Sequence, residues 1–454
     1  MTKRTPNRPV VTISRRGADR IRAGHVWVYR SDVVEAEGVQ PGSVILVQQQ
    51  ENIPDRQFTD RSVRVTQAKA DIKFRAARTL GTALYSSASE IALRMISAKP
   101  VEDLEQLVRE RIRAAIAYRE RFVHHTNAYR VIFSEGDFLP GLIVDRYNDI
   151  LSIQVLTQAM DSASMREIFS DELELGLQPK VIVERTDARI KRLEQLPEKE
   201  SGVIWASNVH AGPDALVRAG EPGSPSITAQ SAAGRVRALA PTQVETKFQM
   251  NGVRFLFDAL AGQKTGSFLD QRENYAAAAQ YARGEALDVF CYQGGFGLHL
   301  APKCQSVTGV DSSRPALEMA EQNAALNARE IEWIEANAFD LLRDYSDTGK
   351  KYDCIILDPP AFAKSKRELP TALRGYKELN LRALKMLRPG GILITCSCSY
   401  HVTAADLLET ISAAALDSHR ILRILENRGQ SKDHPTVLGI PETAYLKCLI
   451  FAVS

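Results

Sequence analysis

The sequence lacks any long hydrophobic run and is poor in cysteine. No stretch approaches the roughly 20 consecutive apolar residues that a membrane-spanning helix needs. The N-terminal stretch MTKRTPNRPVVTISRRGADR has no apolar segment of the signal-peptide kind. The six cysteines include neither a CxxC pair nor a His/Cys cluster with zinc spacing. These absences predict a reduced, cytoplasmic protein without a disulfide framework, a membrane partner or a metal.

Positive charge is concentrated in two segments. The chain has 454 residues and a net charge of only +3, yet residues 1–30 contain eight Lys and Arg against one Asp. A second cluster covers residues 364–388, with eight Lys and Arg against two Glu. Such clusters in a nearly neutral chain favour a polyanionic partner such as RNA. An ordinary solvated basic face is the alternative for either cluster taken alone.

The composition and the predicted secondary structure change twice along the chain, and its length suits about three domains. Residues 1–99 have the composition of a small β-rich domain with a polar loop over 48–78, and residues 100–243 predict a small α+β domain. Helices are expected over 101–122, 160–176 and 187–194, and a Gly/Pro/Ser-rich linker over 212–234. Residues 244–454 alternate strands and helices, which predicts an α/β, doubly wound, Rossmann-like domain.

A glycine-rich turn after the first strand of this last domain predicts a ligand site. LDVFCYQGGFG places Asp288 on the strand and Gly294 and Gly295 in the turn, but it does not have the GxGxxG spacing of dinucleotide sites. The next strand ends at Asp311, where an acid can hold a ribose diol, and the third is followed by Asn337, which could bind an adenine edge. No Walker lysine motif occurs. A nucleoside-bearing ligand without a pyrophosphate fits, and S-adenosylmethionine is the expected cofactor.

The succession of these motifs resembles a known family. DVFCYQGGFG, VDSS, ANAF, LDPPAF and SCS occur in the order seen in class I S-adenosylmethionine-dependent methyltransferases. AGQKTGSFLDQREN, FSEGDFLPGLIVDRY, RGYKELN, KDHPTV, PETAYLKC and the opening RRGADRIRAGHVWVY resemble, more narrowly, the bacterial 23S rRNA cytosine-C5 methyltransferases with an N-terminal PUA domain. The resemblance covers nearly the whole chain and is strong over 131–147 and 261–454.

The resemblance implies a role for each matching residue. Asp288, Gly294 and Gly295 would line the methionine side of the cofactor, Asp311 the ribose, Asn337 the adenine and Asp358 the opening to the substrate. Families of this kind commonly have Asp at the place of Asn337, and Asp288 could instead only cap its turn. The segment before the first strand would supply the cofactor pocket or its lid, with Lys264, Thr265, Phe268, Asp270, Gln271 and Arg272.

Methylation at carbon 5 of cytosine predicts a cysteine nucleophile. That carbon becomes nucleophilic only after a thiolate has added to carbon 6. In TCSCSYH, Cys396 and Cys398 point to the same face of a strand end. In the family resembled here the nucleophile is the seventh residue after the Gly pair, which is Cys398 when counted from Gly391. Cys396 and the other four cysteines are therefore expected to be packing residues.

The remaining site residues concern the base and the RNA. Asp358 of LDPPAF is expected to orient a flipped cytosine and to favour protonation at N3, and Phe362 either stacks on the base or packs in the core. The expected partner is 23S rRNA or a ribosomal particle, and a homodimer is left open. The expected RNA-binding residues are Arg15, Arg16, Arg20, Arg22, Lys364, Lys366 and Arg374.

Two other functions stay open at the level of sequence. A purine methyltransferase, acting at guanine N7 or an exocyclic amine, also fits a DPP motif followed by an aromatic residue, but it needs no cysteine. A non-catalytic RNA-binding or ribosome-assembly factor would not need the cofactor loop. The sequence identifies neither the target nucleotide nor the base that removes the carbon-5 proton.

Overall fold

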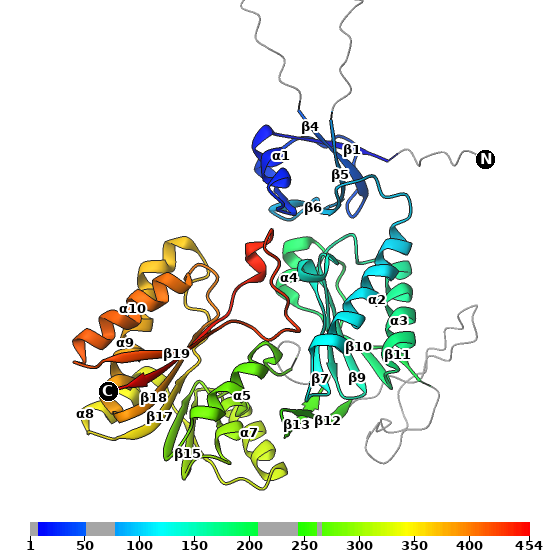
Figure 1. Ribbon diagram of the computed structural model, residues 1–454. Coiled ribbons are helices and arrows are strands. Elements are labelled where there is room, and N and C mark those ends of the chain that lie inside the picture. The colour runs from blue at the N-terminus through cyan, green and yellow to red at the C-terminus, as the bar shows by residue number, and fades with distance from the viewer. Residues whose placement is uncertain (1–7, 51–77, 208–243, 261–265) are drawn as a thin grey trace, which may run out of the picture.

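The computed structural model describes residues 8–50, 78–207, 244–260 and 266–454 (Figure 1). Lys264 and Thr265, the predicted linker over 212–234 and most of the polar loop predicted over 48–78 lie outside the described residues. None of the helices in the described ranges has the length and apolar character that crossing a bilayer requires.

A six-stranded sheet forms the N-terminal part, in the order β2-β6-β5-β4-β1-β3. Its strands are β1 (Val10–Ile13), β2 (Trp27–Tyr29), β3 (Val33–Glu35), β4 (Val44–Gln49), β5 (Thr79–Tyr85) and β6 (Ile91–Ser97). The β-rich prediction missed helix α1 (Arg15–Arg22), whose first turn is capped by the Ser14 hydroxyl accepting from the Gly17 N–H at 3.1 Å. The four arginines expected to bind RNA therefore lie on a helix.

A five-stranded mixed sheet follows, in the order β11-β10-β9-β8-β7. Its strands are β7 (Ala128–Phe133), β8 (Leu142–Tyr147), β9 (Ile150–Val155), β10 (Val181–Glu184) and β11 (Gly202–Ala206). Helices α2 (Leu104–Phe122), α3 (Ala163–Leu177) and α4 (Ala188–Glu194) agree with the three helices predicted from periodicity. A hairpin, β12 (Glu245–Met250) and β13 (Val253–Asp258), joins this part to the next; Tyr147 stacks on Phe257 at 3.7 Å between ring centroids.

The C-terminal part is the predicted doubly wound sheet, with the order β16-β15-β14-β17-β18-β20-β19. The strands are β14 (Glu285–Val289), β15 (Ser306–Asp311), β16 (Glu332–Glu335), β17 (Tyr352–Leu357), β18 (Leu387–Ser397), β19 (Leu422–Arg428) and β20 (Lys447–Val453). The first five are parallel, whereas β20 is antiparallel to both β18 and β19. The prediction of an α/β fold is confirmed, but it had not included β12, β19 or β20.

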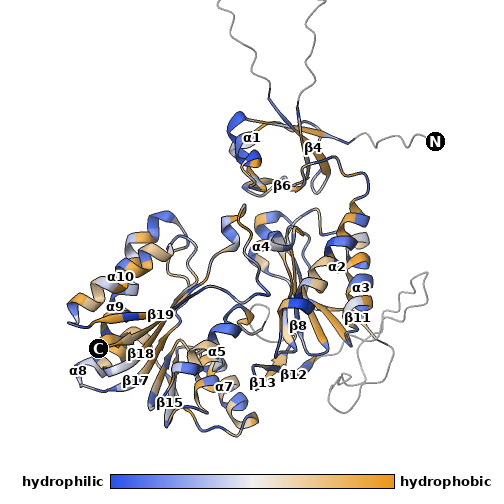
Figure 2. Ribbon diagram, viewed as in Figure 1, coloured by the Kyte–Doolittle hydropathy of each residue, from blue (hydrophilic) through white to orange (hydrophobic). Residues whose placement is uncertain are grey.

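Helices cover both faces of this sheet, and the apolar residues gather on the strands and on the inward sides of the helices (Figure 2). Residues of α5 (Arg272–Tyr281), α6 (Gly295–Leu300) and α7 (Arg314–Leu326) pack in one core. Residues of α8 (Ala338–Asp347), α9 (Leu369–Met386) and α10 (Ala404–Asp417) pack in the other. Strand residues alternate between the two cores, as a period of two requires.

The segment between β19 and β20 links the parts of the molecule. It leaves the sheet and runs up beside the central and N-terminal parts (Figure 1, red). Near its start, the backbone carbonyl of Asp433 accepts a hydrogen bond from Arg119 of α2 at 2.7 Å. Near its end, Glu442 is 3.1 Å from Nε2 of His25 in the N-terminal part. This segment, residues 429–446, is called the linking segment below.

Candidate active site at the carboxyl ends of the strands

Period-two alternation brings the predicted catalytic residues to one face of the sheet. Ala286, Ile356 and Ile394 all pack in the core formed with α5 and α6. Two residues further along each of these strands stand Asp288, Asp358 and Cys396, and two residues beyond Cys396 stands Cys398. The carboxyl ends of parallel strands meet at one edge, which is where ligands bind in open α/β sheets. The structure therefore brings these residues together at that edge.

The glycine-rich turn after β14 is held in an unusual backbone conformation. Phe290 and Tyr292, neither of them glycine, have φ angles of 66° and 49°, and Gly294 has a φ of 83°. A Cβ atom on Gly294 would lie 2.7 Å from the ring of Trp333, so both conformation and packing require glycine there. Strained residues of this kind cluster at ligand sites. The turn thus has the geometry expected of a loop that approaches a ligand closely.

Asp288 has a hydrogen-bonding oxygen with no protein partner. Its Oδ2 atom accepts from the N–H of Gly297 at 2.8 Å, but its buried Oδ1 atom has no hydrogen-bond partner among the described residues. Burial, with a contribution from the charge of Asp311, raises the pKa of Asp288 to about 7. Buried polar atoms are nearly always satisfied. A ligand with an N–H group beside Oδ1 would supply the missing hydrogen bond. Capping of the turn accounts for only one of the two carboxylate oxygens of Asp288.

Asp311 and two aromatic rings form the neighbouring part of the edge. The carboxylate accepts the N–H of Tyr292 and the N–H of Ser313, each at 2.9 Å. Each oxygen keeps a second lone pair that can accept from a ribose hydroxyl. The ring of Tyr292 is 5.1 Å from that of Phe268, which is 38% exposed. Asn337 caps α8 through its side-chain oxygen, and its amide nitrogen has no hydrogen bond to the described residues.

Gln271 and Cys396 both donate hydrogen bonds to Asp358. Nε2 of Gln271 lies 3.0 Å from each carboxylate oxygen, and the thiol of Cys396 is a further hydrogen-bond partner. The orientation of the Gln271 amide is fixed because its oxygen accepts from Asn274 at 2.7 Å. Burial, with the charges of Asp270 and Asp288, raises the pKa of Asp358 to about 8. Asp358 is therefore mostly protonated at neutral pH and can donate a hydrogen bond.

The two cysteines of TCSCSYH differ in depth. Cys396 is completely buried and lies opposite Cys448 in the β18–β20 pair, and burial raises the pKa of its thiol well above the ordinary value. Cys398 follows the end of β18 and is the only residue from 391 to 399 that is not buried. Its Sγ atom is 3.9 Å from the carbonyl oxygen of Pro359 in the DPP loop. Cys398 is thus the one thiol of the pair that a substrate can reach.

Hydrogen bonds of Ser399 join the loop that carries Cys398, called the cysteine loop below, to the DPP loop. Its hydroxyl oxygen accepts from the N–H of Phe362 at 3.0 Å and lies 3.1 Å from the hydroxyl of Tyr376. Ser397 donates to the same Tyr376 hydroxyl at 2.9 Å. The ring of Phe362 packs 4.9 Å from that of Tyr376, which supports the packing interpretation of Phe362. These contacts fix the position of Cys398 relative to Asp358.

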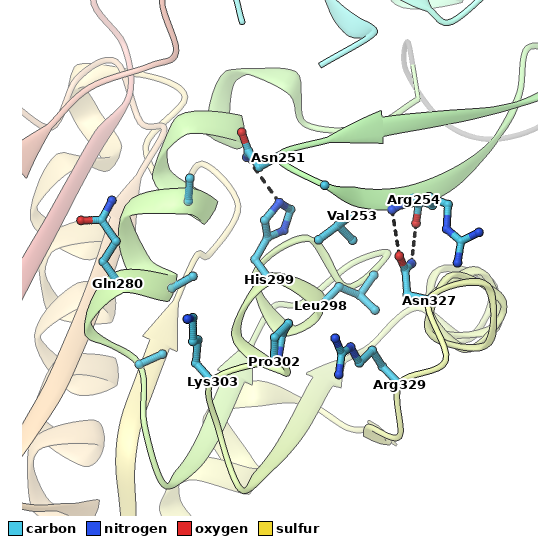
Figure 3. Close-up of a pocket in the computed structure, with 14 residues that line it drawn as sticks. Asn251, Val253, Arg254, Gln280, Leu298, His299, Pro302, Lys303, Asn327 and Arg329 are labelled. Atoms are coloured by element: carbon cyan, nitrogen blue, oxygen red, sulfur yellow. Dashed lines mark hydrogen bonds between the residues drawn. The ribbon is translucent and has the colours of Figure 1, made fainter. Parts of the chain in front are cut away.

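A pocket of about 700 Å³ lies at the opposite edge of the sheet (Figure 3). It is lined by the β12–β13 turn, the ends of α5 and α6 and the residues that follow α7. Helices that follow parallel strands run back along them, so the ends of α6 and α7 lie at the amino ends of the strands. In Figure 3, His299 points toward Asn251, its hydrogen-bond partner at 3.3 Å. Burial lowers the pKa of His299 to about 4, so it is neutral, and none of the acids described above lines the pocket.

Comparison with known proteins agrees with this geometry. The sequence profile of the S-adenosylmethionine-dependent methyltransferases matches residues 233–452, and that of PUA-like domains matches residues 11–53. The chain is 36% identical over 393 residues to the ribosomal RNA large subunit methyltransferase I of Tolumonas auensis, covering 84% of this chain and 89% of that protein. It is 32% identical over 444 residues to the same-named protein of Alteromonas mediterranea, covering 96% of each. The chain belongs to this methyltransferase family.

Solved structures show the same fold across the whole chain. An S-adenosylmethionine-dependent methyltransferase from Streptococcus mutans matches with a TM-score of 0.71 and 16% identity over 98% of this chain and all of that one. A methyltransferase in complex with SAH matches with a TM-score of 0.72, at the same identity and coverage. The predicted PUA-like domain, the Rossmann-like domain and the dependence on S-adenosylmethionine are confirmed.

In this methyltransferase, the cofactor residues predicted from sequence fall into two groups. Phe268, Asp288, Asp311 and the two glycines surround the strained turn, and the open Oδ1 atom of Asp288 suits the amino group of S-adenosylmethionine. Asp270 and Arg272 instead contact the linking segment. Asp270 accepts the hydroxyl of Tyr445 at 2.6 Å, and Arg272, 2% exposed, pairs with Asp433 at 3.2 Å. Direct contact of Asp270 and Arg272 with the cofactor remains a prediction, as does contact of the other residues with it.

The predicted RNA-binding cations are not equally available. Arg16 and Arg20 pair with the buried Asp32 at 2.7 and 3.0 Å, and Arg15 and Arg22 pair with Asp19. Trp27, near these arginines in sequence, donates to Glu135 of the central part at 3.0 Å. Beside the DPP loop, the expected cations are exposed without a carboxylate pair among the described residues: Lys364, Lys366 and Arg374. They remain the better-placed candidates for RNA.

Sequence reasoning missed several residues of the site. Tyr292, Asn274 and Tyr376 orient Asp311, Gln271 and the cysteine loop. They lie within the quoted motifs DVFCYQGGFG, AGQKTGSFLDQREN and RGYKELN, but the sequence analysis assigned them no role. Lys447, the first residue of β20, likewise lies within the quoted motif PETAYLKC. Its side chain is only 9% exposed and reaches the carbonyl oxygen of Ser399 at 2.7 Å.

Proposed function

We propose that this methyltransferase transfers a methyl group to carbon 5 of a cytosine in large-subunit (23S) ribosomal RNA, through a covalent adduct with Cys398. The observation that carries the proposal is the position of Cys398. It is the only residue from 391 to 399 that reaches the surface, and it does so beside the DPP loop that holds Asp358. A methyltransferase for purine nitrogens has no use for a thiol there. The choice of ribosomal RNA as the substrate follows from the names of the relatives.

The covalent step follows from the chemistry of cytosine. The thiolate of Cys398 forms a bond to carbon 6, and the electron pair of the C5–C6 double bond moves toward carbon 5 as N3 takes up a proton. S-adenosylmethionine supplies the electrophilic methyl group that carbon 5 then takes up. Loss of the carbon-5 proton to a base returns its electron pair to the C5–C6 bond, the C–S bond breaks to release the thiolate, and N3 gives back the proton that it had taken up. The reacting base must first leave its stack to reach Cys398.

Asp358 is suited to the proton transfer at N3. Neutral cytosine presents N3 as an acceptor, and Asp358 is largely protonated at neutral pH because burial raises its pKa to about 8. Gln271 and Cys396 are hydrogen-bond partners of the Asp358 carboxyl group within the protein. The hydrogen bonds that this carboxyl group can still make are therefore available to the cytosine. We propose that Asp358 donates a proton to N3 as the thiolate adds.

The rate should consequently fall with rising pH as Asp358 ionises. Because its pKa is raised to about 8, the protonated form is fully present below that pH and is lost above it. Asp358→Asn should lower kcat by about 10²–10⁴-fold, because an amide donates a hydrogen bond but transfers no proton, and should remove the decline near pH 8. Asp340→Asn, an exposed change on α8, is the matched control. A wild-type rate in Asp358→Asn would contradict the assignment.

The product tests the proposed function itself. Large-subunit RNA, as naked transcript or ribosomal particle from cells lacking this protein, is incubated with the protein and S-adenosylmethionine and digested to nucleosides for mass spectrometry. We expect 5-methylcytidine. A methylated guanosine or adenosine would overturn the proposal in favour of a purine methyltransferase. No methyl transfer to either substrate form would favour a non-catalytic RNA-binding factor.

A further inference from the structure

Lys447 is a buried lysine whose position is set by the antiparallel pairing of β20 with β18. Lys447 pairs with Ser397 in register, which places it one residue from Cys398 across the strand end. Its Nζ atom donates to the carbonyl oxygens of Ser399 at 2.7 Å and Tyr445 at 2.9 Å. Lysine is rarely buried unless it is paired. No carboxylate of the described residues lies within ion-pair distance of this ammonium group, so its charge is not accounted for by a salt bridge.

The ammonium group has a donor to spare and is coupled to Cys398. Two of its three N–H groups are used by the carbonyls, and the third has no acceptor among the described residues. Burial lowers the pKa of Lys447 to about 8, and the influence that most strongly opposes this shift is the charge of Cys398, followed by that of Asp406. The lysine and the thiol are therefore close enough to interact through their charges.

A nearby positive charge lowers the pKa of a thiol and so favours the thiolate at neutral pH. The titratable groups that interact with Cys398, or with its neighbours Tyr376 and Lys447, come from four elements. They are Tyr376 of α9, Asp406 of α10, Asp358 after β17 and Lys447 of β20. Asp406 is engaged by the N–H and hydroxyl of Thr403, at 2.9 and 2.7 Å, in the cap of α10. Of these four groups only Lys447 is a cation.

We propose that Lys447 is a positioning residue for the nucleophile: its ammonium group stabilises the thiolate of Cys398 and, through Ser399, fixes the loop that carries it. The inference rests on the proposed role of Cys398. It adds a cation that favours the thiolate used in the covalent mechanism. The alternative is that Lys447 only ties the loop to β20 by its two hydrogen bonds, with no effect on the thiol.

Alkylation of Cys398 separates these two roles. Full-length protein, without RNA or cofactor, is treated with iodoacetamide at a series of pH values between about 5.5 and 9.5, which includes the ordinary thiol pKa of about 8.5. Carboxamidomethylation of Cys398 is followed by peptide mass spectrometry. Lys447→Met removes the charge, Lys447→Gln removes it but keeps an N–H donor for the carbonyls, and Lys447→Arg keeps it. Lys432→Met, an exposed change in the linking segment, is the matched control.

Both neutral variants should react with iodoacetamide about tenfold more slowly at pH 7, with the pH profile displaced to higher pH. Lys447→Arg should recover part of this reactivity, and Lys432→Met should match the wild type. An unchanged profile in folded Lys447→Gln would overturn the proposal, as would equal displacement in Lys447→Arg and Lys447→Gln. Because no RNA is used, such a failure concerns Lys447 alone. A displaced profile in a protein that forms no 5-methylcytidine would instead contradict the proposed function.

Discussion

Replacing Cys398 with alanine is expected to abolish methylation of the RNA, by at least about 10⁴-fold, which is the scale seen when a covalent nucleophile is removed. The binding of S-adenosylmethionine should stay within about twofold, since the cofactor residues surround the turn after β14 and the thiol lies beside the DPP loop. Both quantities are accessible, the first by transfer of a radioactive methyl group and the second by calorimetry. A loss of cofactor affinity equal to the loss of rate would show a structural role for Cys398.

Cys396→Ala is the matched control, because it makes the same chemical change two residues earlier on the same strand. Cys396 is buried and supplies one of the hydrogen bonds to Asp358. The substitution should lower the free energy of unfolding by about 1 kcal/mol, for the small cavity it leaves, and should retain most of the methylation rate. If instead Cys396→Ala were inactive and Cys398→Ala active, the assignment of the nucleophile would have to be exchanged.

Asp433→Ala should cause the largest loss of stability that we predict, about 3–5 kcal/mol, because it removes the buried carboxylate that pairs with the buried Arg272 and accepts the N–H of Arg130. Asp433 is completely buried in the linking segment. Its carboxylate accepts the N–H of Arg130 at 2.9 Å and pairs with Arg272 at 3.2 Å. The aspartate thus joins the central sheet, the helix α5 and the linking segment. Urea unfolding measures the effect, and Asp344→Ala, exposed on α8, is the control.

The contribution of Asp433 should also depend on pH. Burial alone would raise its pKa, but His434, Arg272 and the N–H of Arg130 outweigh burial and hold the pKa of Asp433 well below its ordinary value. The stability that it contributes is therefore fully present above the unfolded-state pKa of about 3.9 and is lost as the pH falls below it. The difference in unfolding free energy between the wild type and Asp433→Ala should shrink on acidification. A difference independent of pH would mean that the carboxylate charge is not what stabilises the segment.

Much of the site could be predicted because it depends on local patterns. Alternating strands and helices predicted the doubly wound sheet, and the rule that ligands lie beyond the carboxyl ends of strands placed Asp288, Asp311 and Asp358 at one edge. The same alternation placed Cys396 and Cys398 on one face but could not separate them. Their difference in depth arises where β18 ends, between the last residue paired with β20, Ser397, and the loop beyond.

The rest depends on contacts between residues far apart in sequence. Arg272 was expected at the cofactor, but its partner Asp433 lies 161 residues away in a segment with no regular pattern. Lys447 reaches the cysteine loop only because β20 pairs antiparallel with β18, and that strand was not predicted. Helix α1 was missed because the first turn carries Arg15, Arg16 and Gly17, which give no apolar periodicity.

Covalent trapping on large-subunit RNA transcribed with 5-fluorocytidine in place of cytidine tests the Cys398 adduct most directly. Fluorine cannot leave as a proton, so the adduct formed after methyl transfer persists. In the presence of S-adenosylmethionine we predict a complex that survives denaturation and is linked through Cys398 on peptide mapping, formed by Cys396→Ala but not by Cys398→Ala. A complex linked through another cysteine, or none under conditions in which unsubstituted RNA is methylated, would contradict the account.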